Sequence, residues 1–304
     1  MIDEFDRVLT TPGHYAYLRI AEGCDNRCAY CVIPSLRGRY RSRRMEDVLA
    51  EAKKLADAGV KECIVIAQDI TRYGIDLYGE KKLAALLREL CKLNFHWIRL
   101  HYLYPDEFTD ELIDTIAAED KVLPYLDIPI QHCNDKVLRA MNRPYDVEKY
   151  LELIAYARRV MPELVLTSDV IIGFPGETEA EAMETVALVE KVRFDALFTF
   201  IFSPRPGTPA AKLPDPVPRE EKQKWFDRLC AVQNGISEEL HRQYVGQTLR
   251  CLVDGVSDDA RWQLTARTAG GRLVHCVGDK NAVGEYRNVK ITDSNTWALF
   301  GEVE

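Results

Sequence analysis

The sequence predicts an α/β fold, namely an open six-stranded parallel (β/α)6 barrel followed by a small all-β barrel of the OB-like kind. Three observations lead to this expectation. Six apolar runs alternate with amphipathic stretches as far as Phe202, six prolines lie in the segment that follows, and five short alternating runs occupy about the last sixty residues. Strands that alternate with helices pair in parallel through right-handed crossovers, whereas strands separated only by turns close into small barrels.

The strands predicted for the first barrel are short apolar runs, and each except the last is followed by a stretch with apolar residues at helical spacing. The predicted strands are 17–21, 63–67, 97–102, 125–130, 165–172 and 196–202. The predicted helices are 45–58, 83–93, 110–118, 136–141, 148–160 and 179–192. Gly59 is a stop signal for the first helix. Because catalysis in such barrels gathers at the carboxyl ends of the strands, the loops after the strands are where a site is expected.

A proline-rich segment, SPRPGTPAAKLPDPVP, separates the two barrels. Proline suppresses helix and sheet, so this segment is predicted to be a stiff linker. One long charged helix is predicted at 220–244, and five short strands are predicted at 248–253, 262–266, 273–277, 286–291 and 297–300. We therefore expect a partial barrel over residues 1–214, a linker and connecting helix over 215–244, and the small β-barrel over 245–304.

The composition is that of an enzyme with one large and one smaller core, since 47% of the 304 residues are hydrophobic. No apolar run is long enough to span a membrane, and the first residues resemble no signal peptide, so we expect a cytoplasmic protein without disulfides. The net charge of −8 argues against a protein that holds nucleic acid by bulk electrostatics. The last sixty residues are close to neutral, with seven Lys and Arg against eight Asp and Glu.

The run EGCDNRCAYC places Cys24, Cys28 and Cys31 in one loop after the first predicted strand. Soft thiolates select iron–sulfur clusters, copper(I) or zinc, and this spacing lets one loop hold three corners of a cubane cluster. A structural zinc site normally closes with four protein ligands, and the next cysteine, Cys63, lies far along the chain. We therefore favour a [4Fe–4S] cluster with one open iron over a zinc knuckle completed by a distant ligand, or over three unconnected thiols.

The remaining cysteines occur singly, and each is interpreted as a small core residue. They are Cys63, Cys91, Cys133, Cys230, Cys251 and Cys276. Cys133 is the one with a possible further role, because it follows a glutamine and a histidine at a strand end. Five arginines follow the cluster loop, namely Arg37, Arg39, Arg41, Arg43 and Arg44. They are either a solvated basic turn or a set of guanidinium groups that hold anionic parts of a cofactor or substrate.

Several motifs together resemble those of the radical S-adenosylmethionine (SAM) methylthiotransferases, and the resemblance covers essentially the whole chain. The motifs are the cluster loop with RGRYRSR, AQDITRYGIDLYG, LHYLYPDEFTDELID, YLDIPIQHCNDKVLRAMNR, IIGFPGET and the closing β-barrel, which that family calls the TRAM domain. The family attaches a methylthio group to an unactivated C–H carbon. The resemblance therefore implies a radical SAM partial barrel with a TRAM-like barrel behind it.

Two branches of the family compete in this resemblance. Residues 1 to about 161 are similar to the RimO-like branch, which modifies an aspartate of a small-subunit ribosomal protein, chiefly through RYGIDLYG and DIPIQHCND. From about residue 167 onward, FTFIFSPRPGTPAAKLPDPVP and LTARTAGGRLVHC are more similar to the MiaB-like branch, which modifies an isopentenylated adenosine beside the tRNA anticodon. We favour the ribosomal aspartate, because most of the barrel strands lie in the first of these regions.

The resemblance also implies the cofactors and the residues that hold them. Cys24, Cys28 and Cys31 are the expected ligands of a [4Fe–4S] cluster whose open iron binds SAM, which a one-electron reduction cleaves to a radical that abstracts hydrogen from the substrate. The expected cofactor-binding residues are Tyr30 against the adenine, Gly173 at a close backbone approach, Gln131 and Asp169 at strand ends, and Arg143 at the cofactor carboxylate. For Gln131, Asp169 and Gly173, an ordinary structural role is an equal alternative. No catalytic residue is expected beyond the cluster.

Full-length members carry an N-terminal domain with a second [4Fe–4S] cluster, whereas only about twenty residues precede Cys24 and no second cysteine triad exists. The resemblance therefore implies a fragment that lacks the sulfur-delivering domain. Expected partners are a small-subunit ribosomal protein or subunit, with tRNA as the alternative, and an electron donor such as flavodoxin or ferredoxin, but no membrane. Two other classes stay open: a non-catalytic iron–sulfur module that binds RNA or the ribosome, and a generic radical SAM dehydrogenase or methylase, which the terminal barrel disfavours.

Overall fold

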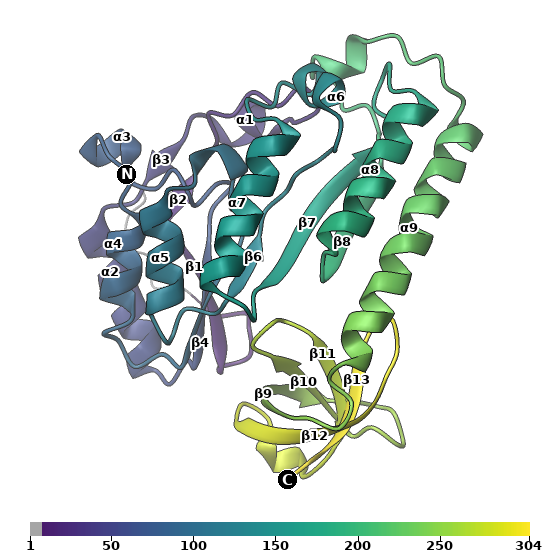
Figure 1. The fold of residues 1–304 in the computed structure, drawn as a ribbon. Helices are drawn as coiled ribbons and strands as arrows, with labels where there is room; N and C mark the ends of the chain where they lie inside the picture. The colour runs from purple at the N-terminus through teal and green to yellow at the C-terminus, as the bar shows by residue number, and fades with distance from the viewer. Residues whose placement is uncertain (1–7) are drawn as a thin grey trace.

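Six parallel strands in two three-stranded sheets form the first part of the molecule (Figure 1). The computed structural model describes residues 8–304. One sheet has the order β1 (Tyr15–Arg19), β4 (Glu62–Ile66) and β5 (Trp97–Leu100), and the other has the order β6 (Tyr125–Asp127), β7 (Val165–Ile172) and β8 (Ala196–Ile201). All four ladders within these sheets are parallel. The open α/β barrel that the strand–helix alternation predicts is confirmed.

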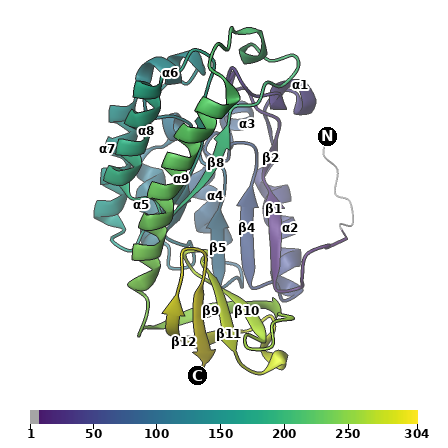
Figure 2. The same ribbon diagram turned by 90° about the vertical axis from the view of Figure 1, so that its right-hand side faces the viewer.

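The two sheets meet between β5 and β6 without a full ladder. A single parallel bridge joins Ile98 to Val122, and the Leu103 N–H donates to the Asp127 carbonyl at 3.1 Å. β5 and β6 have only four and three residues, which leaves little length for pairing. β1 and β8 therefore form the two edges of a half-barrel, and the long helix α9 (Arg219–Arg242) runs past β8 to the second barrel (Figure 2).

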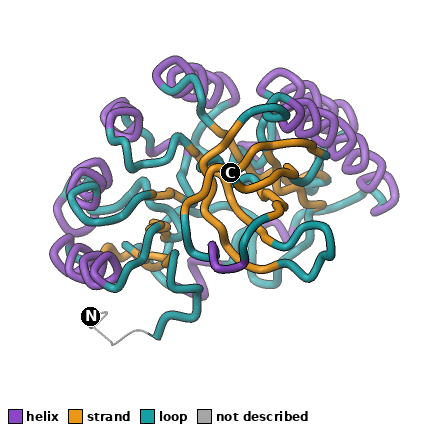
Figure 3. Tube along the Cα trace, turned by 90° about the horizontal axis from the view of Figure 1, so that it is seen from below, coloured by secondary structure: helices purple, strands orange, loops and turns teal. Residues whose placement is uncertain are grey.

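The helices form an arc outside the strands when the molecule is seen from below (Figure 3). They are α1 (Ile33–Arg37), α2 (Met45–Asp57), α3 (Ile75–Tyr78), α4 (Leu83–Leu90), α5 (Asp110–Ala118), α6 (Asp135–Ala140), α7 (Val147–Val160) and α8 (Glu179–Val192), with 3₁₀ turns at Pro105–Glu107, Ala210–Lys212 and Lys280–Ala282. Side-chain caps fix where several helices begin. Thr178 and Glu181 form a capping box at α8, and Asp146 caps α7. No helix among residues 8–304 has both the length and the apolar character to cross a membrane.

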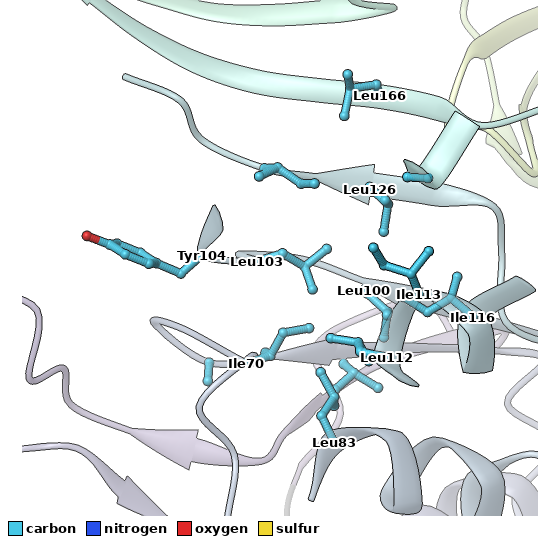
Figure 4. Close-up of a cluster of buried hydrophobic side chains, with 14 of the residues drawn as sticks. Ile70, Leu83, Leu100, Leu103, Tyr104, Leu112, Ile113, Ile116, Leu126 and Leu166 are labelled. Atoms are coloured by element: carbon cyan, nitrogen blue, oxygen red, sulfur yellow. The ribbon is translucent and has the colours of Figure 1, made fainter. Parts of the chain in front are cut away.

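The main core lies between the strands and the helices outside them. Figure 4 shows part of it, where Leu100, Leu103 and Leu126 from the strand side meet Leu83 of α4 and Ile113 of α5. Each of these side chains is almost fully buried. Burying one such side chain stabilises the fold by roughly 1.5–3 kcal/mol before entropy is counted, so this contact holds the helices against the sheet.

The last part of the chain is a closed five-stranded barrel. Its order is β10 (Leu264–Thr268), β11 (Leu273–Val277), β13 (Leu299–Val303), β12 (Tyr286–Ser294) and β9 (Thr248–Val256). It has a core of its own, in which Cys251 and Cys276 are both buried. The five predicted strands are confirmed. Two of them begin later than predicted, because the backbone N–H groups of Trp262 and Trp297 bond to Asp259 and Asn295 side chains in turns that precede the strands.

Two strands of the half-barrel also differ from the prediction. β1 begins and ends two residues early, and Ala21–Glu22 is a separate strand, β2, that pairs with β3 (Arg41–Ser42). Buried apolar residues, namely Leu18, Ile20 and Ala21, continue across this change, so hydrophobicity does not mark the break. β6 ends at Asp127 instead of Ile130, since Pro129 and the left-handed Gln131 (φ 71°) follow.

A buried interdomain charge network, formed by Glu62, Arg99, Asp254 and Arg267, fixes the small barrel to the amino ends of the half-barrel strands. Glu62 of β4 is fully buried and accepts hydrogen bonds from Arg99 Nε at 2.7 Å and from Arg267 Nη1 of β10 at 2.6 Å. Arg267 Nη2 also donates to Asp254 of β9 at 3.0 Å. Removing one partner of such a buried group typically costs about 3–5 kcal/mol, so the network sets how the two barrels meet.

Candidate iron–sulfur and cofactor site

The cluster loop, residues 24–31, connects β2 to α1 at the carboxyl end of the half-barrel. Backbone hydrogen bonds join it to three distant segments. The Cys24 N–H donates to the Gly38 carbonyl at 3.2 Å, the Ala29 N–H to Met141 at 2.9 Å, and the Ala29 carbonyl accepts from Ala210 at 2.9 Å. The loop is thus held from several sides without its cysteine side chains being used.

Polar side chains also hold the cluster loop in place. The Asn26 amide donates to Asp69 Oδ2 at 3.0 Å, and the Asn142 amide donates to the Arg27 carbonyl at 2.7 Å. Asp69 is fully buried, and burial raises the pKa of its carboxyl, while the Thr71 and Asn26 hydrogen bonds oppose that shift. Sequence reasoning missed Asn26 and Asp69, although a carboxylate directly after the buried strand β4 was a usable signal.

The three cluster-loop thiols are free and half-buried. Burial raises the pKa of the Cys24 thiol to about 11 and also raises that of Cys31, so both are protonated at neutral pH until a metal displaces the proton. Cys28 and Cys31 both contribute to the raised pKa of the Cys24 thiol, so the three thiols lie close to one another.

The donor set fits a cubane cluster better than a single ion. Within residues 8–304, no three His, Cys, Asp or Glu side chains converge as ligands of one metal ion would. A zinc knuckle needs such convergence, whereas the three thiolates of a [4Fe–4S] cluster each bind a different iron and stand apart. Cys24, Cys28 and Cys31 are therefore the residues that would hold the cluster.

Arg143 lies directly against the cluster loop. Its guanidinium is buried, with Nη1 3.4 Å from Cys28 Sγ and Nη2 donating to the Pro129 carbonyl at 3.1 Å. The Tyr104 and Tyr145 rings lie 4.5 and 5.4 Å from its central carbon. This places a fixed positive charge beside one cluster thiol, and the assignment of Arg143 to the cofactor carboxylate stays a prediction.

Tyr30 lies in a cavity of about 470 Å³ between the cluster loop and β8. Ile171, Phe200 and Phe202 line the same cavity. Burial raises the pKa of the Tyr30 hydroxyl well above its usual range, so it stays neutral. A cavity next to the cluster loop that combines aromatic side chains with polar ones such as Arg205 and Gln223 is suited to a planar heterocycle such as adenine, as the sequence prediction for Tyr30 requires.

Gln131 and Asp169 are brought together at the strand ends. The Gln131 N–H donates to the Asp169 carbonyl, and the Gln131 carbonyl accepts from Ile171, both at 2.8 Å. Leu166 and Val170 of β7 pack into the main core, so the alternate residues Asp169 and Ile171 face the inside of the half-barrel. Burial raises the pKa of both Asp169 and Tyr30, and the positive charge of Arg143 opposes the rise at each, so these predicted residues share one electrostatic environment.

Replacing Asp169 with asparagine is expected to stabilise the protein at neutral pH. Burial, reinforced by Asp127, raises the Asp169 pKa to about 6 from 3.8. The folded state therefore holds this proton more tightly than the unfolded chain, and stability falls as pH rises through this window. Urea denaturation should show D169N gaining on the order of 1 kcal/mol over the parent at about pH 7.5, and less at about pH 5. The exposed Asp258→Asn is the control; an equal effect there would contradict the assignment.

Gly173 has left-handed backbone (φ +75°), and Lys222 of α9 covers it. A Cβ at this position would lie 2.5 Å from Lys222 Cδ. Lys222 is buried and donates to the Gly173 carbonyl at 2.7 Å and to Asp215. The close approach of Gly173 backbone to the adenine stays a prediction; the group that lies over Gly173 in the structure is a lysine, which fixes α9 and the proline-rich segment to the loop after β7.

His132 and Glu177 form a buried pair that sequence reasoning missed. His132 Nε2 lies 3.1 Å from Glu177 Oε1, and both side chains are fully buried. The His132 Nδ1 accepts from the Asn134 N–H at 3.1 Å, so Nε2 carries a proton. Glu177 Oε2 accepts from the Phe174 N–H at 2.8 Å. The pair links the loops after β6 and β7, which carry Gln131 and Gly173. A titratable residue in each of these two strand-end motifs was the sequence signal that could have predicted the pair.

Replacing Glu177 with alanine is expected to lower the free energy of unfolding by about 3–5 kcal/mol, because it removes the buried carboxylate beside the His132 imidazole and leaves the buried Phe174 N–H without its acceptor. Anaerobic urea denaturation measures this. Glu190→Ala, on the exposed face of α8, is the matched control and should change stability by less than about 0.5 kcal/mol. Equal effects of the two variants would show that the pair does not brace the loops.

The arginines after the cluster loop are largely engaged by carboxylates of the same chain. Arg37 pairs with Glu22, Arg39 with Asp25, Arg43 with Glu51 and Arg44 with Glu46. Arg41 donates to the backbone carbonyls of residues 37 and 39. Among the other cysteines, Cys63, Cys133, Cys251 and Cys276 are buried, and Cys91 and Cys230 are partly buried. Cys133 is fully enclosed, and burial raises its thiol pKa, so it has the character of a core residue.

Two family models match the chain. Residues 18–189 match the Radical SAM superfamily, and residues 242–303 match the TRAM domain. Among solved structures, coproporphyrinogen III oxidase (HemN) from Escherichia coli has a TM-score of 0.56 over 96% of this chain and 72% of its own, at 18% identity. TsrM of Kitasatospora setae, solved with cobalamin and a [4Fe–4S] cluster, has a TM-score of 0.54 over 78% of this chain and 39% of its own, at 17% identity. These two likenesses concern the fold alone.

Curated relatives are similar along almost the entire chain. The ribosomal protein uS12 methylthiotransferase RimO of Clostridioides difficile is 43% identical over 99% of this chain and 69% of its own length, and that of Heliobacterium modesticaldum is 42% identical over 97% and 65%. The tRNA-2-methylthio-N(6)-dimethylallyladenosine synthase of Clostridium botulinum is 41% identical over 94% and 64%. The chain thus spans about two thirds of the length of these relatives.

The cofactors follow from the family, whose members use a [4Fe–4S] cluster and SAM, and the cluster loop carries the thiol set that this requires. The predicted fold class, cofactors and enzyme class are confirmed by the two family models and the curated relatives. The chain belongs to the radical SAM methylthiotransferase family.

Proposed function

We propose that this chain forms the radical-generating and substrate-facing part of an enzyme that methylthiolates the β-carbon of an aspartate in ribosomal protein uS12. The observation that carries this is the identity of 40–43% to seven curated uS12 methylthiotransferases, over at least 97% of the chain in each case. The similarity includes both the half-barrel and the small barrel, so it concerns the surfaces that meet a substrate as well as the cluster loop.

Each predicted residue is given a role consistent with its place. The cluster and SAM, when bound, supply a 5′-deoxyadenosyl radical that takes hydrogen from an unactivated carbon. Cys24, Cys28 and Cys31 hold the cluster, and Arg143 keeps a positive charge beside the Cys28 sulfur. We assign Tyr30 to the adenine cavity.

Strand-end residues would shape the remainder of the cofactor site. We assign Gln131 and Asp169 to polar contacts with SAM, because Gln131 follows the end of β6 and is bonded through its backbone to β7, where Asp169 faces the inside of the half-barrel. Gly173 acts through Lys222, by keeping α9 close to the loop after β7. The aromatic side chains around Tyr30 would limit the access of water to the reacting atoms.

The test is to incubate the reconstituted holoenzyme, with SAM and a reductant, separately with small ribosomal subunits and with isopentenylated tRNA, and to weigh the products. A gain of one methylthio group on uS12 is the expected result. A methylthiolated tRNA with unmodified uS12 would assign the chain to the second branch. If neither is modified while 5′-deoxyadenosine still forms, the proposed substrate is wrong and the family assignment stands.

A further inference from the structure

Exposed arginines lie in the cluster loop and in the segment around the short helix α1 that follows it. Over residues 24–44, six arginines stand against one aspartate, whereas the whole chain has 48 acidic and 40 basic residues. We refer to the exposed side chains of Arg27, Leu36, Arg37, Arg39 and Arg41 as the basic face. On a protein of net charge −8, such a positive region attracts an acidic partner to one place on the surface.

The basic face is held directly against the cluster loop. The Cys24 N–H donates to a carbonyl just after α1 at 3.2 Å, and Arg39 Nε lies 3.5 Å from Asp25 Oδ1 in the loop itself. The Arg41 guanidinium donates to the carbonyls of Arg37 and Arg39 at 3.2 and 3.1 Å, and so closes the turn after α1. The face is therefore formed before any partner binds, next to the backbone that carries the cluster thiols.

The basic face lies outside the predicted cofactor cavity. Other segments cover the far part of the cluster loop, where backbone bonds join Ala29 to Met141 and to Ala210. None of the five side chains of the basic face lines the cavity that contains Tyr30. Another protein can therefore approach the cluster loop over this face without entering the half-barrel.

Helix α1 leaves an apolar side chain exposed among these arginines. None of its residues is buried, and Leu36 is 71% exposed. The Arg39 side chain is 89% exposed, and its ion pair with Asp25 is long and open to solvent. Such exposed pairs contribute little to stability, so Arg39 can exchange Asp25 for a carboxylate of a partner. An exposed leucine beside several arginines has the composition of a protein-binding surface.

The side chains of the basic face favour an acidic protein over RNA. Single-stranded RNA is held by cations together with exposed aromatic rings on which its bases stack. The only aromatic residue between Arg37 and Arg44 is Tyr40, which is 5% exposed and donates its hydroxyl to the Asp69 carbonyl at 2.9 Å. The exposed apolar side chain, Leu36, is aliphatic. Arginines with an aliphatic contact between them match a surface of carboxylates and apolar side chains.

We propose that the basic face is the docking site of an acidic one-electron carrier protein, which reduces the [4Fe–4S] cluster through the adjoining loop. In this step the reduced carrier loses one electron and the cluster gains it, without exchange of a bond or a proton. Weak electron-transfer encounters bury little surface, so one short helix and a few arginines are sufficient. The inference concerns reduction of the cluster and does not depend on which substrate the enzyme modifies.

The test uses the anaerobically reconstituted holoenzyme and a flavodoxin of net negative charge. The Kd of their complex, measured by anisotropy of labelled flavodoxin, is expected to rise about tenfold in Arg39→Glu and several-fold in Leu36→Ala. Formation of 5′-deoxyadenosine at low flavodoxin concentration should slow in parallel. With dithionite as the reductant, both variants should keep the rate of the parent. Added salt should weaken the parent complex and reduce its advantage over Arg39→Glu.

Arg242→Glu is the matched control, because this exposed arginine also pairs with one carboxylate, Glu238, but lies at the end of α9 beside the small barrel (Figure 1). It should leave the flavodoxin affinity unchanged. Iron content checks that each variant holds its cluster, and Arg39→Gln replaces Arg39→Glu if the latter binds less iron than the parent.

Three results would overturn the inference. The first is an equal effect, or no effect, of the Arg39 and Arg242 variants on flavodoxin affinity. The second is a raised KM for SAM with dithionite in the Arg39 variant, which would show that this arginine holds the cofactor. The third is weaker binding of small ribosomal subunits or tRNA with unchanged flavodoxin affinity, which would make the face a nucleic-acid site. The flavodoxin assay contains no uS12, so failure of the proposed function would not alter its outcome.

Discussion

Replacing Cys28 with alanine is expected to abolish the iron–sulfur cluster and, with it, all reductive cleavage of SAM. Two thiolates cannot hold a cubane cluster that already has one open corner, and Arg143 would lose the sulfur that its guanidinium contacts at 3.4 Å. Iron analysis and electron paramagnetic resonance after anaerobic reconstitution measure the cluster. The parent should bind about four irons per chain and C28A almost none. Formation of 5′-deoxyadenosine with dithionite should disappear in parallel.

Cys230→Ala is the control for this experiment. Cys230 is partly buried on α9 beside Thr199 and lies outside the cluster loop, so its loss should leave the iron content unchanged. Full iron content in C28A would show that the cluster is held elsewhere. About eight irons in the parent would show that the scattered cysteines assemble a second cluster.

Replacing Gly23 with alanine is expected to displace the cluster loop and lower cluster incorporation several-fold. Gly23 has φ +79°, and a Cβ there would overlap the Arg39 carbonyl and lie 2.7 Å from the Gly38 carbonyl oxygen. Left-handed backbone costs alanine about 1–2 kcal/mol, and the overlap is with backbone that also accepts the Cys24 hydrogen bond. Iron content and thermal denaturation of the reconstituted protein measure the effect.

Gly13→Ala is a matched control for this backbone argument. Nothing lies within 4 Å of a Cβ at Gly13, and its φ is not in the left-handed region. G13A should keep both the cluster and the melting temperature of the parent. If G23A incorporates iron as well as G13A does, the turn before the cluster loop is more adaptable than its contacts imply.

Most of the fold could be predicted from local pattern, because strand–helix alternation and a cluster of short strands each admit few architectures. The cluster cysteines were equally accessible, since one short loop carries all three. The ends of the strands were harder to predict from the sequence. Buried apolar residues lie on both sides of the break between β1 and β2, namely Leu18 before it and Ile20 and Ala21 after it, so the break leaves no clear change in hydrophobicity to detect.

The buried charged partners could not be predicted from the sequence. A glutamate inside the apolar strand Glu62–Ile66 signals that a partner must exist, but the partner, Arg267, is 205 residues away on the other barrel. The same holds for Glu177, whose histidine partner lies on another strand-end loop, and for Lys222, which fills the space beside Gly173. Such pairings are decided by how whole elements pack, and no spacing within one segment encodes them.

The interdomain charge network has a consequence for chimeras that exchange the small barrel between members of the family. A small barrel taken from a relative places that relative's residue at position 267. Glu62 stays in the half-barrel of the recipient and must pair with it. Where the two do not match, a carboxylate buried at the seam faces only Arg99, and the chimera loses stability for a reason unrelated to substrate choice. A chimera intended to exchange specificity should therefore take residues 62 and 99 from the same relative as the small barrel. The buried charges at the boundary then remain matched.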